Sequence, residues 1–465
     1  MKRMMPYTLL ATLVCCSFLL LNAQETKLDK TFKEQTVQQL NNLMNDHYVV
    51  PDVAKETSKH LNKKMEAGAF DEYTTLETFA EALTKEVQSI NNDKHMRIRP
   101  IPPYVSRENT PESMLKERLH AISESRESTA GFREVKKMDG NVGYLDLRGF
   151  AGVDKGGPIA DSYMKLLSTS DAIIIDLRKN GGGSPAMVQY LCSYFFDKQV
   201  HLNSLYWRAR DTMEFWTLEK VGGEKMPDVP LFVLTSNYTF SGAEEFSYNM
   251  QTQKRATLVG ETTGGGANPG GGFPINEKLR VFIPTGRAIN PITKTNWEGV
   301  GVVPEVKTSA EEALDRAHEL AKIEAEKYRA SMKQKYTDLL SELQKNIQHF
   351  NEQTSDEQII SSIQKCTMTG LLGEETINMM GYDYLMKENK PYLATVLFKA
   401  NTILFPNSAN AFDSYGEALA ASGKMGESLA NYQRAVELAK ANDDPNLQLF
   451  IENLKKTEAK MKSKP

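Results

Sequence analysis

Ser241 is the residue whose type and position best fit nucleophilic chemistry. It follows an apolar, β-branched run at residues 231–235 and precedes residues with helical spacing, so it stands where a strand turns into a helix. A hydroxyl at that turn, next to the small Gly242 and Ala243, leaves room for a substrate carbonyl, as in a nucleophile elbow, although G-x-S-x-G is absent. Ser241 and Glu244 also fit a helix capping box, so this segment alone leaves a catalytic and a structural role open.

Three glycine triplets indicate places where a ligand approaches the backbone closely. They contain nine of the 30 glycines and lie at residues 181–183, 264–266 and 270–272. The first follows an apolar strand and precedes a helix, so its N–H groups can face a phosphate or form an oxyanion hole. No Lys-Ser or Lys-Thr pair follows, which argues against a nucleotide P-loop, and no convincing G-x-G-x-x-G fingerprint is present.

The elements that must position these residues alternate between strands and helices. Such alternation is typical of an α/β layer fold with a mostly parallel sheet. The expected strands are 142–147, 172–176, 231–235, 257–259 and 279–283, and the expected helices are 158–168, 185–196 and 242–252. Asp176 and Arg178 follow the second strand, and we interpret them as structural partners at the end of the sheet.

Helical segments flank this core on both sides. Apolar residues at helix spacing predict a three-helix bundle over residues 28–92, whereas residues 100–135 show no pattern and are expected to be a connecting segment. Ser309 and Glu312 fit a capping box that opens a long, charged helix reaching about Phe350.

The first 23 residues have the layout of a secretory signal peptide. Lys2 and Arg3 precede an apolar run from Tyr7 to Leu21, which is shorter than the roughly 20 residues of a membrane span. An uncleaved N-terminal anchor is the alternative interpretation. Two of the four cysteines lie in this segment, and we expect the other two, Cys192 and Cys366, to be buried as small hydrophobic residues.

Composition narrows the class of protein. The chain has 465 residues, of which 40% are hydrophobic and 25% charged, as in ordinary globular proteins. The formal net charge of −4 gives no basic excess for binding a phosphate backbone, so nucleic acid is not an expected partner.

The C-terminal part contains an internal repeat of 34 residues. A shift of this length pairs Leu385 with Leu419 and Phe398 with Tyr432. The repeat length and its small and aromatic positions resemble the tetratricopeptide repeat. An unrelated pair of helical hairpins is the alternative.

Four further motifs occur in order along the chain. They are Asp176-Leu-Arg-Lys-Asn-Gly-Gly-Gly, Thr239-Phe-Ser-Gly-Ala-Glu, Gly260-Glu-Thr-Thr-Gly-Gly-Gly and Glu298-Gly-Val-Gly-Val-Val-Pro-Glu. Together they make residues 28–310 resemble the tail-specific, or C-terminal-processing, serine peptidase superfamily. The resemblance implies a ClpP/crotonase-like layered sheet, with Ser241 as nucleophile and the N–H groups of Gly183 and Gly242 as oxyanion hole. We expect Gly182, Gly264 and Gly265, with the third triplet, to shape a mobile substrate rim.

The activating base separates two branches of that superfamily. The processing proteases use a lysine in the motif after the nucleophile, where this sequence has Gly264–Gly266. The branch that resembles interphotoreceptor retinoid-binding protein modules and the tricorn protease core uses a histidine and a later glutamate. Asp93-Lys94-His95 matches its D-x-H motif, and Glu298 matches its glutamate. The resemblance therefore implies that neutral His95 accepts the serine proton and that Glu298 orients the imidazole.

These observations predict an exported serine peptidase, periplasmic or extracellular, that cleaves peptide or protein substrates without a metal or cofactor. The alternatives are a non-catalytic lipid- or peptide-binding protein of the same fold and a repeat-based scaffold for a protein partner. The predicted organisation is a signal peptide at 1–23, a helical bundle at 24–98, an α/β peptidase core at 99–308, a helical connector at 309–350 and an all-α tetratricopeptide-like domain at 351–465.

Overall fold

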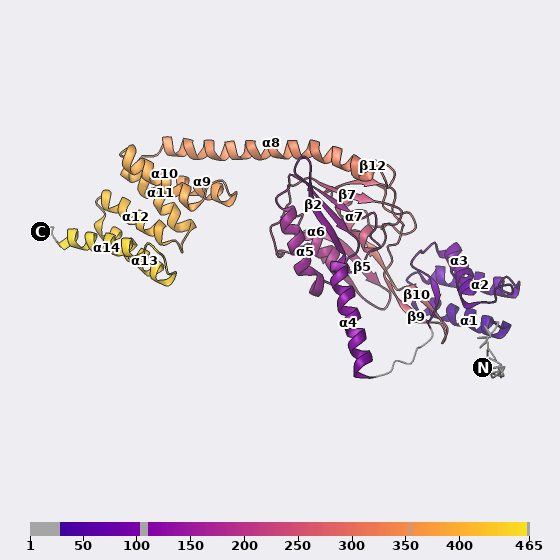
Figure 1. The fold of residues 1–465 in the computed structure, drawn as a ribbon. Coiled ribbons are helices and arrows are strands. Elements are labelled where there is room, and N and C mark those ends of the chain that lie inside the picture. Colours follow the sequence, from indigo (N-terminus) through magenta and orange to yellow (C-terminus); the bar gives the residue numbers. More distant parts are fainter. Residues whose placement is uncertain (1–27, 103–109, 352, 354, 463–465) are drawn as a thin grey trace, which may run out of the picture. The chain divides into compact units, whose positions relative to one another are not determined.

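The computed structural model describes residues 28–102, 110–351, 353 and 355–462. They form two compact units, one ending at Ala325 and one beginning with Glu326 (Figure 1). The expected signal peptide lies outside the described residues. None of the helices in the described part of the chain is long and apolar enough to cross a membrane.

A six-stranded sheet forms the centre of the first unit. Its strands run in the order β12-β8-β7-β4-β3-β2, and all neighbours are parallel except β2 and β3. Their bounds are Phe132–Met138 (β2), Val142–Leu147 (β3), Ala172–Asp176 (β4), Leu231–Thr235 (β7), Thr257–Gly260 (β8) and Val306–Lys307 (β12). Every residue of β4 and β7 is buried, as expected for central strands covered on both faces. The predicted mostly parallel sheet is confirmed.

Helices follow the strands of this sheet as the sequence pattern predicted. They are α5 (Val153–Leu167), α6 (Pro185–Ser193), α7 (Gly242–Thr252) and α8 (Ala313–Gln348). The start of α8 packs on the sheet through alanines four residues apart, Ala313, Ala317, Ala321 and Ala325, which lie in one core cluster with Ile174 and Phe232. Cys192 of α6 is buried, as expected.

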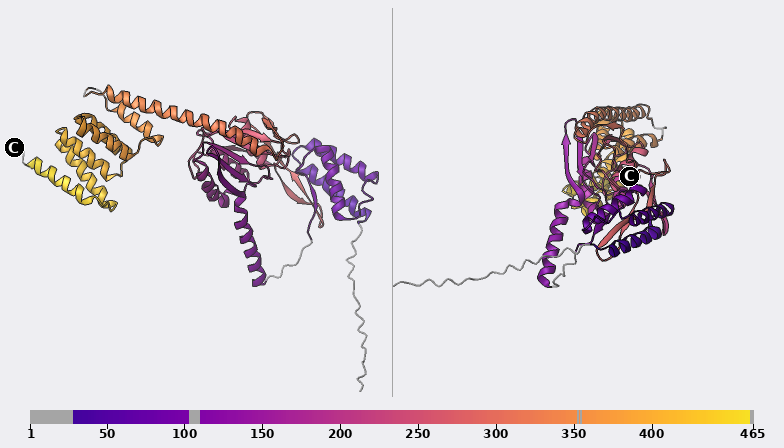
Figure 2. Two further views of the ribbon diagram at one scale, coloured as in Figure 1. Left: turned by 45° about the horizontal axis from the view of Figure 1, so that its top comes forward. Right: turned by 90° about the vertical axis from the view of Figure 1, so that its right-hand side faces the viewer.

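A second sheet joins the N-terminal helices to a distant part of the chain. The helices are α1 (Lys30–His47), α2 (Pro51–Glu66) and α3 (Leu76–Asn91), and the sheet has the order β1-β10-β9. Its strands are Ile98–Pro100, Leu279–Pro284 and Gly270–Pro274, respectively. Leu83 and Phe79 of α3 share one core with Val281 and Ile283 of β10, and both further views show the three helices beside β9 and β10 (Figure 2). The three-helix bundle is confirmed, but a hairpin from much later in the sequence completes its core.

Two parts of this unit differ from the sequence expectation or were not predicted. Residues 100–135, expected to be irregular, contain α4 (Pro111–Ser128), which Thr110 and Pro111 start and which extends away from the sheets (Figure 1). Its apolar residues are not buried against either sheet; Leu115 is 58% exposed. A third, antiparallel sheet has the order β11-β5-β6, made by Gly286–Ile289, His201–Trp207 and Arg210–Trp216.

The second unit is helical throughout its described elements. They are α9 (Glu357–Met368), α10 (Glu374–Tyr382), the π-helical turn η2 (Asp383–Lys387), α11 (Pro391–Leu404), α12 (Ala409–Ala421), α13 (Met425–Ala441) and α14 (Leu447–Lys462). Cys366 of α9 is buried with Ile363 and Leu397, as expected. The chain is therefore an α/β core with helices before it and a helical region after it.

Candidate active site

Ser241 occupies the turn between β7 and α7 with an unusual backbone conformation. Its φ is 53° and its ψ −120°, a combination that costs free energy in a residue with a Cβ. Two neighbouring side chains hold the turn: Thr239 Oγ1 accepts from the Ser236 N–H at 2.9 Å and donates to the Leu177 carbonyl at 2.8 Å. The Ser241 N–H donates to Glu244 Oε2 at 2.9 Å. Strained, fixed backbone of this kind is typical of a functional residue.

The first glycine triplet lies directly against Ser241. A Cβ on Gly182 would come within 2.8 Å of Ser241 Cβ and 2.7 Å of the Gly242 nitrogen, so no side chain fits there. A Cβ on Gly242 would lie 3.1 Å from the Gly183 nitrogen, which places the two expected oxyanion donors side by side. Within the described residues, neither the Gly183 N–H nor the Gly242 N–H has a protein acceptor. The structure therefore brings Ser241, Gly182, Gly183 and Gly242 together around two free donors.

The end of β4, which leads into this triplet, is held by Asp176, Arg178 and Asn180. Asn180 accepts from the Gly182 N–H at 2.8 Å and donates to the Leu147 carbonyl at 2.9 Å. Arg178 pairs with Asp176 at 2.6 Å. The ion pair confirms the structural role expected for these two residues.

Glu244 fixes the second glycine triplet, a role the sequence analysis missed. The buried carboxylate accepts from Thr263 Oγ1 at 2.5 Å, from the Gly265 N–H at 2.6 Å and from the Gly266 N–H at 2.8 Å. Burial raises the pKa of Glu244, and these hydrogen bonds oppose that rise. One side chain thus ties the Ser241 turn to the loop opposite it. The only sequence signal was the capping box, which indicates a helix start and not a second loop.

Glu298 holds the continuation of the same loop. Its Oε2 accepts from the Ala267 N–H at 2.7 Å and from the Asn268 N–H at 3.0 Å. Four consecutive N–H groups, from Gly265 to Asn268, therefore point at two carboxylates. The other oxygen of Glu298, Oε1, is buried without a hydrogen-bond partner. Burial, with the nearby Asp93 charge, raises the pKa of Glu298 to about 8.

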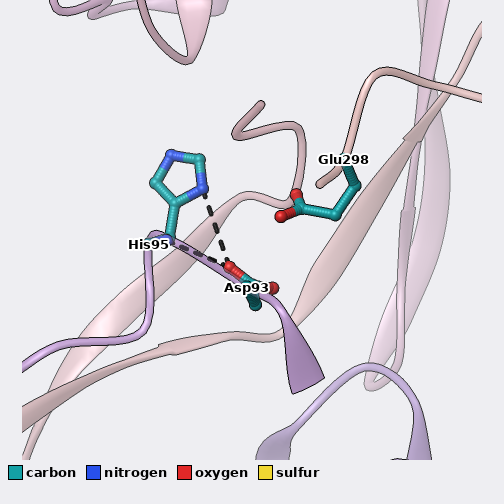
Figure 3. A group of neighbouring side chains, drawn as sticks. All are labelled: Asp93, His95 and Glu298. Carbon is teal, nitrogen blue, oxygen red and sulfur yellow. Dashed lines mark hydrogen bonds and ion pairs between the residues drawn. The ribbon is translucent and has the colours of Figure 1, made fainter. Parts of the chain in front are cut away.

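His95 lies beside Glu298 and Asp93 (Figure 3). The left-handed Asn92 ends α3, and the turn that follows is closed by Asp93 Oδ1, which accepts from the His95 N–H at 3.1 Å. The His95 Nδ1 atom is buried and has no hydrogen-bond partner; Asp93 Oδ1 is 4.0 Å from it. Burial, aided by the Arg97 charge, lowers the pKa of His95 to about 4, so its imidazole is neutral at physiological pH.

Asp93 is the second residue the sequence analysis passed over, although it begins the D-x-H motif. It is fully buried, and its Oδ2 accepts from Asn268 Nδ2 at 3.1 Å and from the Tyr48 hydroxyl at 3.4 Å. Burial raises the pKa of Asp93, as it does that of Glu298. Asp93, His95 and Glu298 each offer an atom within 4.8 Å of the others.

Asp93, His95 and Glu298 are residue types that bind metal ions, but too few of their ligand atoms are free. Both Asp93 oxygens and Glu298 Oε2 already accept hydrogen bonds, which leaves His95 Nδ1 and Glu298 Oε1. A catalytic zinc site takes about three protein ligands. Two unpartnered buried atoms, one a potential N–H donor and one an acceptor, suit a hydrogen bond between imidazole and carboxylate better.

Phe240 packs against His95. Its ring centroid lies 4.6 Å from that of His95, and Phe240 directly precedes Ser241. Within the described residues no hydrogen bond links Ser241 to His95. A Cβ on Gly266 would meet both the Phe240 ring and His95 Cε1, the latter at 2.8 Å, so this glycine lets the loop pass over both rings. The ring of Phe240, the residue before Ser241, thus covers the imidazole of His95.

A cavity of about 780 Å³ opens beside His95. Phe240, Gly264 and Gly272 line it, together with Lys94 and three arginines. Gly265 is buried behind Gly264. The third triplet, expected to be part of a mobile rim, forms the start of strand β9 and pairs with β10. Glycine is needed at position 270, since a Cβ there would lie 2.1 Å from the Ile283 carbonyl oxygen.

Comparison with known protein families matches both halves of the first unit. Residues 141–308 match peptidase family S41, and residues 23–137 match the N-terminal domain of peptidase S41 in eukaryotic IRBP. The two matches leave only residues 138–140 between them.

Two curated proteins are similar over part of the chain. A carboxy-terminal-processing protease of Bartonella bacilliformis is 24% identical over 174 residues, which are 37% of this chain and 39% of that protein. The tricorn protease of Thermoplasma volcanium is 22% identical over 228 residues, 43% of this chain and 19% of that protein. The chain therefore spans well under two thirds of either relative.

Solved structures matched by this chain include a lipoprotein from Streptococcus agalactiae and the photosystem II D1 C-terminal processing protease. The lipoprotein is 15% identical, with a TM-score of 0.40 over 62% of this chain and 96% of that chain. The processing protease is 14% identical, with a TM-score of 0.37 over 61% of this chain and 94% of that chain.

Proposed function

Because this chain belongs to the S41 family of serine-type peptidases, we propose that it hydrolyses peptide bonds through an acyl-enzyme on Ser241. The observation that carries the proposal is the arrangement around this serine. Ser241 stands at a strained turn, and the adjacent N–H groups of Gly183 and Gly242 have no protein acceptor among the described residues. Fixed donors of this kind stabilise the charge that develops on a carbonyl oxygen under attack.

In the proposed reaction His95 is the base and then the acid. Ser241 Oγ attacks the substrate carbonyl and its proton passes to His95 Nε2; the oxyanion is held by Gly183 and Gly242. His95 then gives the proton to the leaving amine, and a water molecule, deprotonated in the same way, releases the acyl group. Phe240 turns aside when substrate binds, because its ring now lies against the imidazole.

Glu298 orients the imidazole in this proposal. A hydrogen bond from His95 Nδ1–H to Glu298 Oε1 would satisfy the two buried atoms that now lack partners. It would also direct Nε2 away from the carboxylates and place a negative charge next to the imidazolium formed during reaction. Asp93 supports the geometry from the other side by holding the His95 backbone.

The decisive experiment is labelling with a fluorophosphonate probe, combined with a general peptidase assay. Wild type is expected to react, and Ser241→Ala is expected to lose both labelling and hydrolysis. Ser247→Ala is the matched control, since Ser247 lies on the same helix and its hydroxyl only donates to the Ala243 carbonyl. Labelling that persists in Ser241→Ala contradicts the proposal.

A binding protein without catalysis remains the competing function within this fold. A lipid carrier would need a large apolar pocket. The cavity beside His95 is lined by four cationic side chains as well as by Phe240, Val281 and Phe282, which favours a ligand with both polar and apolar groups, such as a peptide.

We also propose that the second unit is tetratricopeptide-like and binds a protein partner as an accessory. Two equivalent aromatic residues, 34 positions apart, pack over glycines that are 35 positions apart: Phe398 over Gly381 and Tyr432 over Gly416. Small–aromatic packing that recurs at about the repeat length supports this assignment. A chain ended after residue 350 should still hydrolyse small peptides; loss of that activity in a folded truncate contradicts an accessory role.

Export is proposed from residues 1–23 alone. Cleavage after Ala23 would give a mature chain that begins at Gln24, in the periplasm or outside the cell. N-terminal sequencing of the protein from its native host tests this, and an intact Met1 terminus contradicts it.

A further inference from the structure

Three arginines project from one face of the second sheet. Arg99 of β1 lies directly opposite Arg280 of β10, and Arg97, two residues before Arg99, is linked to Phe282 by a 3.1 Å backbone hydrogen bond. The alternate residues, Ile98 and Val281, point into the bundle core. Since side chains alternate across a strand, the arginines share the face opposite that core.

Repulsion between the opposed arginines lowers the stability of this sheet, and no acidic side chain among the described residues pairs with them. Like charges directly opposite each other on a sheet destabilise it. Among the described residues, none of Arg97, Arg99, Arg280 or Lys94 forms an ion pair. Two of these cations make backbone contacts only: Lys94 Nζ donates to the Gly264 carbonyl at 2.6 Å and Arg97 Nε to the Lys94 carbonyl at 3.2 Å.

The four cations line the cavity beside His95, and no acidic residue lines it with them. An adjoining cavity of about 740 Å³ shares Lys94, Arg97 and Arg99 and also includes Glu77 and Glu81, which form no ion pair with the arginines. The whole chain is acidic, with a net charge of −4, so this concentration of positive charge is local.

We infer that this cavity selects peptide substrates that carry several acidic side chains next to the cleaved bond. The inference rests on the proposed peptidase function and names its substrate class. One carboxylate satisfies one arginine in a bidentate pair, whereas cations spread along β1, β10 and the Lys94 turn need several. Gly272 leaves open space over the same face, since a Cβ there would meet nothing within 4 Å.

Direct binding to the full-length Ser241→Ala protein tests the inference without any catalytic step. The probes are fluorescent peptides with amidated C-termini, one rich in Glu and Asp and one with Gln and Asn at the same positions. A third peptide keeps Gln and Asn but has a free C-terminal carboxylate. Fluorescence anisotropy should show the acidic peptide binding at least about tenfold more tightly than the other two, and the difference should shrink as salt concentration rises.

Added substitutions locate the effect. Arg99→Gln with Arg280→Gln should remove the preference, while the matched pair Arg133→Gln with Arg287→Gln, exposed arginines away from the cavity, should keep it. Arg280→Glu, which lowers the charge of the cavity by the same two units, should also remove it. Thermal unfolding checks the fold, and the first pair is expected to unfold at the same or a higher temperature because opposed charges are removed.

The outcomes separate this inference from the proposed function. Equal binding of the acidic and amide peptides overturns it, as does equal behaviour of the two arginine pairs. Binding of the free-carboxylate peptide as tightly as the acidic one also overturns it, since a single terminal carboxylate would then be the ligand. Failure of wild type to hydrolyse any peptide would count against the peptidase proposal alone, because the binding preference is measured on a protein without the nucleophile.

Discussion

The two halves of the candidate site are built in different ways. The half that contains Ser241 comes from two neighbouring junctions of one parallel sheet, where β4 and β7 end side by side. The half that contains His95 is assembled from the end of α3, the loop at residues 263–268 and the turn around Glu298, which are far apart in the sequence. The first half relies on local turns, the second on long-range contacts between buried carboxylates and backbone.

The difference extends to how complete each half is. The N–H groups of Gly183 and Gly242 lie side by side next to Ser241 and have no protein acceptor among the described residues. His95 Nδ1 and Glu298 Oε1 are buried and unpartnered, and Phe240 covers the imidazole. We call the half that contains Ser241 the nucleophile half and the half that contains His95 the base half. If substrate binding completes the base half, substitutions in the two halves should have different effects.

The largest effect is expected from Glu298→Gln, which tests the base half. A glutamine amide carries no negative charge that could stabilise the imidazolium of His95, so kcat/KM should fall roughly 10³-fold. Glu298 has a raised pKa of about 8, so it is protonated below that pH and ionised above it; wild-type activity should rise with pH through about 8.

The pH–rate profile of Glu298→Gln should lack this rise. Glu245→Gln is the control, because Glu245 is a buried carboxyl of α7 whose pKa burial raises to about 7, yet it contacts Asn203 and not the site. A rise near pH 8 that survives in Glu298→Gln would show that another group controls it.

The nucleophile half should respond to Gly182→Ala. The new methyl group would collide with Ser241 and the Gly242 nitrogen, so kcat should fall about 10²-fold through loss of the oxyanion geometry. Gly426→Ala in α13 of the second unit, where a Cβ has open space, should leave kcat unchanged. Steady-state kinetics of the two variants compare them, and equal losses would contradict the assignment of the donors.

Glu244 connects the halves, and Glu244→Gln should cost stability. Each carboxylate oxygen accepts two hydrogen bonds, so replacing either by NH₂ leaves two buried donors unsatisfied, which costs about 2 kcal/mol in the free energy of unfolding. Urea unfolding measures this.

The neighbouring Glu245→Gln should behave oppositely above pH 7. The folded-state pKa of Glu245 is raised to about 7, so its contribution to stability is present at low pH and is lost as pH rises through 7. The glutamine variant should therefore gain stability relative to wild type above that pH. Equal effects of the two substitutions would mean that burial alone, and not the loop contacts, matters.

The smallest effect is expected at Phe240. Phe240→Ala lets water reach the imidazole, and since burial is the main cause of the low His95 pKa, that pKa should rise by about one unit toward 6.5. An NMR titration of the His95 ring protons measures the shift. Phe282→Leu, whose ring lies farther from His95 at 5.8 Å, should give a smaller change. No rise in Phe240→Ala would show that Phe240 does not control access to the base.

The nucleophile half was the more predictable from sequence, and the reason is physical. Strand ends, glycine turns and helix starts are encoded by neighbouring residues, so Ser241, Gly183 and Gly242 could be placed relative to their own elements. His95 and Glu298 could be named only from motif resemblance, because residue spacing says nothing about distance across a fold.

The two missed site residues share one property: each depends on contacts between distant segments. Glu244 fitted a helix cap and Asp93 began the D-x-H motif, but their second partners, Gly266 and Asn268, lie in another loop. Helix α4 was missed although Leu115, Leu119 and Ile122 recur at helix spacing, because these few apolar residues lie in a highly charged segment.

The shared core of the N-terminal helices and β10 sets the order in which a newly made chain can mature. While the ribosome is still translating the central sheet, the bundle has its helices but lacks Val281 and Ile283, so Phe79 and Leu83 stay partly uncovered. Long-range closure of this kind is slow and leaves apolar surface exposed meanwhile. Strand β1, which follows the turn carrying His95, can pair only after β10 has been synthesised, and Glu298 follows later still. The last part of the candidate site is therefore synthesised after nearly all of the rest of the first unit, so a shorter nascent chain cannot contain a complete site.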